Sequence, residues 1–197
     1  MEAVPTELTK FQKEFLWEWS IPEKQAIDLA VAIPAESYGW RPAENARTFS
    51  EALVHIAAGC FMLLYRAEVH TPEVMKVCGS PKGDGMAKWV ALVRHSLAIE
   101  KRTTAKDDVI ALLKRGFAEV RHTFTEIGPD QMDASRDFGG ETTTVRRIYL
   151  RILAHSHEHM GQVVAYARIM GYTVPWPDPI KLMEQMVASA QHAHRTP

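Results

Sequence analysis

The segment that most constrains this chain runs from Ala52 to Tyr65, where the only strongly polar side chain is that of His55. It follows Thr48 and Glu51, which have the spacing of an N-terminal capping box, so we expect a helix over about residues 48–69. A helix that is apolar on every side is stable only when other elements surround it. The sequence therefore predicts a fold built around this helix, with His55 inside.

Three other long segments have apolar residues at helical spacing and could surround that helix: residues 6–33, 104–127 and 145–170. We expect Pro22 to kink the first of them or to start a new helix. Clean apolar–polar alternation, which is typical of strands, is absent. Four long helices whose connections allow crossovers predict an all-α fold, a four-helix bundle.

The rest of the chain is interpreted as additions to one domain. A length of 197 residues favours a single domain over residues 1–197, with the bundle core at about 6–170. Residues 71–85 carry two prolines and three glycines and predict an inserted loop, followed by a short helix to about residue 100. The C-terminal extension, residues 171–197, predicts a proline-rich tail with a short amphipathic helix.

Composition excludes several classes of partner and location. With 23 Lys and Arg against 24 Asp and Glu, the chain has no general attraction to nucleic acid or anionic membranes. Two cysteines cannot form a disulfide scaffold, and the N-terminus lacks the apolar core of a signal peptide. No apolar run approaches the roughly 20 residues of a transmembrane helix. We expect a cytoplasmic protein that binds neither nucleic acid nor membrane.

The strongest local motif is a pair of histidines, His155 and His159, in the last long segment. Residues four apart lie on one helix face, about 5–6 Å apart at their Cβ atoms, and two such imidazoles can bind one metal ion. Both lie in the apolar seam, whereas His157 is about 200° around the helix from His155 and should face away. The other seam residues are Ile148, Ile152, Val163, Tyr166 and Met170.

Buried imidazoles need partners for their ring nitrogens, because an unpaired buried polar group costs roughly 1–3 kcal/mol. A divalent metal ion held by His155 and His159, with His55 as third ligand, would meet that need. Three ligands from two helices leave positions open for water or substrate, as in catalytic sites. Hydrogen-bonded core histidines remain the alternative for each position. Zinc or nickel suits such ligands, and the residues alone do not choose between them.

Two other functions remain open. His155, Glu158 and His159 match H-x-x-E-H, the inverted zincin motif, in which Glu158 would be the general base of a metallopeptidase. Such enzymes need a further acidic ligand downstream, where Glu184 is the sole glutamate. The third hypothesis is a non-catalytic, stress-related binding module whose metal is structural; a fourth protein ligand would favour it.

Three pieces of the sequence together resemble the DinB/YfiT-like superfamily. They are the connection Ile33–Pro42, the helix start Thr48–Ala57, and the H-x-x-x-H-x-G-Q motif from His155 to Gln162. The resemblance implies an up-down-down-up four-helix bundle, a divalent metal held by His55, His155 and His159, and common homodimers. It also implies relatives that are bacillithiol- or mycothiol-dependent transferases or maleylpyruvate isomerase-like enzymes.

The leading hypothesis is a metal-dependent enzyme, either an S-transferase that uses a low-molecular-weight thiol or a related hydrolase or isomerase acting on a small molecule. The transferase class rests on the resemblance alone. Tyr65, Arg66 and Gln162 lie near the candidate ligands in sequence and could line the site. No catalytic residue is assigned beyond the three histidines.

Overall fold

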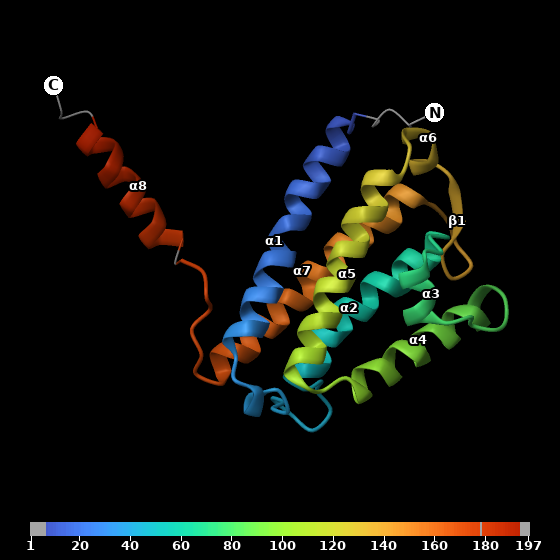
Figure 1. The fold of residues 1–197 in the computed structure, drawn as a ribbon, viewed down its shortest axis with the longest axis horizontal. Coiled ribbons are helices and arrows are strands. Elements are labelled where there is room, and N and C mark those ends of the chain that lie inside the picture. The colour runs from blue at the N-terminus through green and yellow to red at the C-terminus, as the bar shows by residue number, and fades with distance from the viewer. Residues whose placement is uncertain (1–6, 178, 194–197) are drawn as a thin grey trace.

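The protein is an all-α bundle in a computed structural model, which describes residues 7–177 and 179–193. Figure 1 shows the long helices lying side by side. α2 packs against α7, α5 and α4, and α1 packs against α5 and α7. The predicted all-α class is confirmed. The bundle helices are α1 (Lys10–Ala32), α2 (Phe49–Arg66), α5 (Lys106–Glu126) and α7 (Val145–Ile169).

The central helix is α2, as the apolar run predicted. Its first turn forms the expected capping box, in which the Thr48 side chain accepts the Glu51 amide and the Glu51 side chain accepts the Thr48 amide. By length and composition alone α2 could cross a membrane, with a mean hydropathy of 1.2, but 89% of it is buried inside the protein. It is therefore the core helix of a bundle.

The helix α1 passes through Pro22 without a break, so the expected restart is wrong. Ser20, two residues before the proline, does not cap a new helix and instead donates its hydroxyl hydrogen to the Trp17 carbonyl oxygen at 2.6 Å. Trp19 and Ala26, on either side of the proline, are fully buried and Pro22 itself is buried. The continuous apolar stripe stabilises an unbroken helix and offsets the loss of one hydrogen bond at proline.

The insertion is more helical than the sequence suggested. Residues 72–78 form helix α3 (Pro72–Cys78), because Thr71 caps it and Pro72 stands in its first turn, where proline is tolerated. The expected short helix is α4 (Gly85–Arg102), whose 18 residues lie along α2. The expected loop therefore shrinks to residues 79–84, and α4 covers one side of the candidate site.

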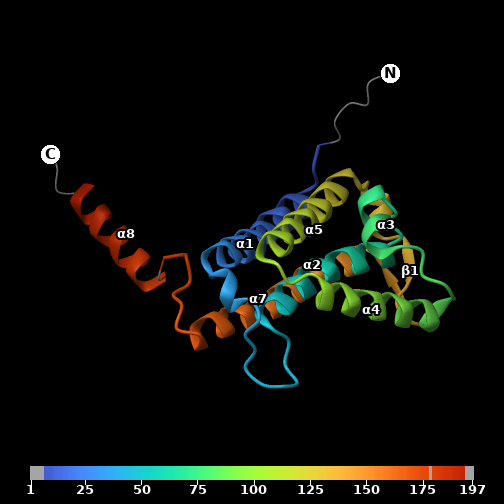
Figure 2. The same cartoon turned by 60° about the horizontal axis from the view of Figure 1, so that its bottom comes forward.

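The remaining elements are short. They are η1 (Ala35–Ser37), α6 (Pro129–Met132), and a two-stranded antiparallel hairpin of β1 (Ser135–Asp137) and β2 (Thr142–Thr144). Three-residue strands are too short to show alternation, so the residue pattern did not predict them. In Figure 2, α8 (Pro179–Ala193) stands apart from the bundle. Ile180, Met183 and Met186 of α8 are exposed.

Candidate metal centre

The structure brings together the three histidines that the sequence singled out. His55 comes from α2, and His155 and His159 come from adjacent turns of α7. The Nε2 atom of His55 lies 3.1 Å from the Nε2 atoms of both other rings. One ligand atom from each residue lies within 4.8 Å of the other two. The three histidines could therefore bind a single metal ion.

A glycine on α2 makes the space for His155. A Cβ atom built at Gly59 would lie 2.3 Å from Cε1 of the His155 ring, closer than atoms can approach. The ring is thus pressed against the backbone of α2, with only 7% of the residue exposed. Any larger residue at position 59 would displace the imidazole.

Groups on neighbouring turns and helices hold the outer nitrogens of two rings. His55 Nδ1 lies 2.7 Å from a carboxylate oxygen of Glu100, a residue of α4 that is only 2% exposed. The same carboxylate accepts a hydrogen bond of 2.7 Å from Arg47. His159 Nδ1 lies 3.2 Å from Oε1 of Gln162, whose amide donates to the Tyr166 hydroxyl. Such partners fix the ring orientation of metal-binding histidines.

Sequence reasoning named Gln162 as a lining residue but missed Glu100 and Arg47. Glu100 lies 45 residues from His55 along the chain, on a helix expected to be short. Only the packing of α4 against α2 brings the carboxylate to the ring. A signal was present, because an acidic residue on the buried side of an amphipathic helix needs a partner.

The outer bonds determine which inner nitrogens carry a lone pair. When His55 and His159 donate their Nδ1 hydrogens to Glu100 and Gln162, each of the two rings carries a lone pair on its Nε2 atom. These two Nε2 atoms lie 3.1 Å apart, and neither has a hydrogen to donate to the other. His55 Nε2 also faces His155 Nε2 at 3.1 Å, and one lone pair accepts only one good hydrogen bond. At least one of these contacts is thus unsatisfied without a cation.

Burial favours the neutral form of two of the three imidazoles, those of His155 and His159. Burial, followed by the neighbouring His55 and His159, lowers the pKa of His155 to about 3. Burial and His55 also lower the pKa of His159. Burial alone would raise the pKa of Glu100, but hydrogen bonds from His55 and Arg47 outweigh it and lower that pKa. Neutral imidazole is the form that binds metals.

Separation of the ring nitrogens also suits one small ion. A tetrahedral ion with metal–nitrogen bonds of about 2.0–2.1 Å sets its ligands roughly 3.3 Å apart. The observed 3.1 Å contacts are close to that value. Among the described residues, the cluster contains no fourth His, Cys, Asp or Glu. The donor set is therefore that of a site with open positions, which disfavours a closed structural metal.

The other residues of the motif point elsewhere. His157 is exposed, as expected. The side chain of Glu158 is 57% exposed and pairs with Arg151 at 3.2 Å on the surface of α7. A general base must reach the water at the metal, so this position disfavours the inverted zincin mechanism. Tyr65 and Arg66 do not line the metal centre; they line a cavity at the far end of α2.

Comparison with known proteins places this geometry in a family. The profile of the DinB superfamily matches residues 23–163, which include all three histidines. The chain belongs to the DinB superfamily. No curated protein sequence matches it significantly.

Two solved DinB-like structures have the same fold. One, from Bacillus cereus ATCC 10987, has a TM-score of 0.59 and 17% identity, covering 84% of this chain and 97% of that one. The other, from Bacillus subtilis, has a TM-score of 0.51 and 17% identity, covering 83% of this chain and 96% of that one. At this identity the likeness shows a DinB-like fold, and the chemistry rests on the residues of this chain.

Proposed function

We propose that this DinB-superfamily protein is a metal-dependent enzyme that transfers a low-molecular-weight thiol to an electrophilic small molecule. The observation that carries the proposal is the convergence of three imidazole nitrogens, with contacts of 3.1 Å that hydrogen bonds alone do not satisfy. His55, His155 and His159 would hold the ion. A divalent cation in such a site lowers the pKa of a bound thiol and so supplies a thiolate near neutral pH.

The residues around the site would support that chemistry. Glu100 and Gln162 hold two of the rings in place, so the inner nitrogens stay aimed at one point. Arg47 is 30% exposed beside Glu100, and its positive charge favours an anionic group at the site. In the transfer, a sulfur–carbon bond forms, the bond from carbon to the leaving group breaks, and the thiol proton passes to solvent.

The thiol in this proposal comes from solution. The two cysteines of the chain, Cys60 and Cys78, are both buried. Burial raises the pKa of each thiol to about 12. Neither is therefore a thiolate near neutral pH, and neither is among the residues of the histidine cluster. An external thiol is the nucleophile that the site could activate.

The test uses untagged protein, because nickel resin could load a foreign metal. Elemental analysis is followed by a fluorescence assay of low-molecular-weight thiols with monochlorobimane. We expect transfer above the uncatalysed rate, loss of it after chelation, and recovery when metal is restored, with Glu158→Gln unchanged. Equal rates before and after chelation would contradict the proposal. A hydrolytic activity lost in Glu158→Gln with metal retained would favour the peptidase.

A further inference from the structure

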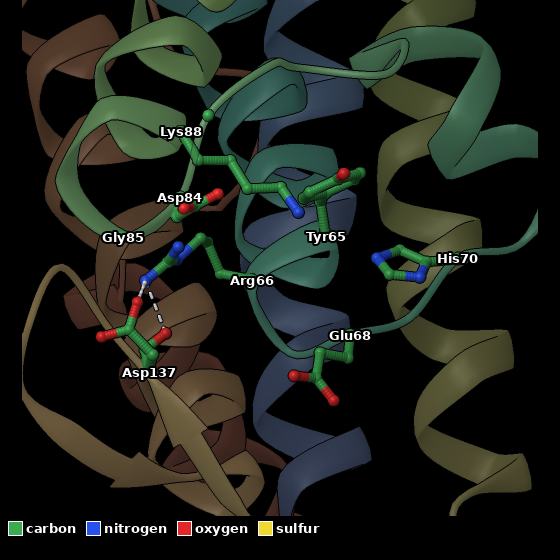
Figure 3. Close-up of a pocket in the computed structure, with 9 residues that line it drawn as sticks. Tyr65, Arg66, Glu68, His70, Asp84, Gly85, Lys88 and Asp137 are labelled. Atoms are coloured by element: carbon green, nitrogen blue, oxygen red, sulfur yellow. Dashed lines mark hydrogen bonds and ion pairs between the residues drawn. The ribbon is translucent and has the colours of Figure 1, made fainter.

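A cavity lies at the opposite end of α2 from the metal centre. Arg66, which lines it, is eleven residues beyond His55, or about 16 Å along the helix. The cavity has a volume of about 480 Å³, which is in the usual range for small-molecule sites. Its lining comes from the end of α2, the start of α4 and the hairpin (Figure 3).

A buried arginine forms one side of this cavity. The Arg66 side chain is only 6% exposed, and it donates a hydrogen bond of 2.8 Å to the Asp137 carboxylate. Its guanidinium lies 5.4 Å from the ring centre of Trp89 and 6.0 Å from that of Phe138. The Nε hydrogen nevertheless has no acceptor. A buried, unpaired donor of this kind is costly to the protein.

Two opposite charges in the cavity also lack ionic partners. The Lys88 ammonium lies 5.1 Å above the Tyr65 ring and, among the described residues, pairs with no carboxylate. Asp84 is the N-cap residue of α4 but accepts no capping hydrogen bond. In Figure 3 the Lys88 side chain extends toward Tyr65 and away from the Asp84 carboxylate. The amides at the start of α4 are thus left without the cap that aspartate usually provides.

The charge balance selects the class of ligand. Lys88 and Arg66 stand against three carboxylates, those of Glu68, Asp84 and Asp137. A phosphate dianion would meet net repulsion in this lining, and a simple cation would leave Lys88 and Arg66 unused. A molecule that carries both charges would meet both unpaired groups. We propose that this cavity binds a small zwitterion of amino-acid or dipeptide type.

The binding mode follows from the lining. The ligand carboxylate lies near Lys88, Arg66 and the amides at the start of α4, where the helix dipole favours negative charge. The ligand ammonium pairs with Asp84. The rings of Tyr65 and His70, 4.7 Å apart at their centres, contact the stem of the ligand. This site is separate from the metal centre and does not depend on the reaction proposed there.

Binding is tested on the full chain by saturation-transfer NMR with the standard amino acids and glycylglycine, followed by calorimetry of the tightest binder. We expect binding at millimolar concentration or below. The N-acetyl and amide derivatives of that ligand, each lacking one charge, should bind about tenfold more weakly or worse. Lys88→Met and Asp84→Asn should each weaken binding by a similar factor. His155→Ala should leave it unchanged, which separates this site from the metal centre.

Lys82→Met is the matched control, because Lys82 is exposed on the loop just before α4 and does not line the cavity. Three outcomes would overturn the proposal: no amino acid or glycylglycine binds, Lys88→Met binds as tightly as the unaltered protein, or the N-acetyl derivative binds as tightly as the free amino acid. Binding of inorganic phosphate in place of all zwitterions would assign the cavity to anions and would also overturn it.

Discussion

The two ends of α2 contain polar groups of different kinds on the same helix face. Near the N-terminus of α2, His55 meets two other imidazoles that are kept neutral by burial. Near the C-terminus, Arg66 is charged and already paired with Asp137. At the first end the ring nitrogens of three imidazoles face one another, whereas at the second end Asp137 compensates the charge of Arg66. The partner elements, α7 at one end and the hairpin with α4 at the other, set that difference.

The contrast matters for what each end can bind. Ring nitrogens that face one another are satisfied together only by a cation. The end of α2 that carries Arg66 needs no ion to be stable, because Arg66 is already paired with Asp137. The unpaired groups of the cavity there, Lys88 and Asp84, therefore select a ligand without determining the fold. Three variants test this interpretation of the histidine cluster.

The largest effect is expected for His159→Ala, which removes one of the three converging nitrogens. Two remaining ligands hold a divalent ion weakly, so stoichiometric metal binding should be lost, as measured by elemental analysis after dialysis. His157→Ala is the matched control, because this histidine is exposed two residues away on the same helix. Full metal content in His159→Ala would remove the proposed ligand set. Loss of metal in His157→Ala would mean that the site lies elsewhere.

Gly59→Ala should have the next largest effect. The added Cβ would lie 2.3 Å from the His155 ring, so the ring or the two helices must move apart. Overpacking of this kind typically costs about 1–3 kcal/mol of unfolding free energy, and a displaced His155 would also weaken metal binding. Chemical denaturation and metal titration would measure the two effects.

Gly161→Ala provides the comparison for that variant. Gly161 is an exposed glycine of α7 with nothing within 4 Å of its Cβ position. Alanine inside a helix is more stable than glycine by roughly 0.5–1 kcal/mol, so this variant should gain stability and keep its metal. Equal behaviour of the two alanine variants would show that Gly59 is not needed to accommodate His155.

Much of this arrangement could be predicted from local patterns. The capping box at Thr48 and Glu51 located the start of α2, and the apolar seam of α7 put His155 and His159 on one face. A single polar residue in an apolar helix, His55, then had to face a polar partner. These inferences depend on periodicity and burial, which act over one or two helical turns.

Other features depend on contacts that no local pattern encodes. Glu100 reaches His55 only because α4 packs along α2, and the helix expected in this segment gave no indication of where it would pack. Arg66 was placed near the metal from its position in sequence, but eleven residues of helix carry it to the other end of the bundle. Helix register and packing decide these positions, and distance along the chain is a poor guide to both.

Glu100→Gln should have the smallest of the three effects. Glutamine keeps the shape of the side chain and can still accept a hydrogen bond from His55 Nδ1, but it removes the negative charge that supports the ring. Loss of such an outer partner typically weakens metal binding about 10- to 100-fold, so calorimetric metal titration should show a drop in that range. The ¹⁵N chemical shifts of the His55 ring should change as well, because the tautomer is no longer held by a carboxylate.

The matched control for that prediction is Glu51→Gln. Glu51 is also a buried glutamate in contact with α4, since it accepts a hydrogen bond of 2.8 Å from Lys101, but it caps α2 and touches none of the histidines. This variant should lower the free energy of unfolding and leave the metal affinity unchanged. If both variants weaken metal binding equally, Glu100 acts through the general stability of the bundle. If only Glu100→Gln does, its carboxylate acts through the ring of His55, and the metal centre then extends beyond its three histidines to α4.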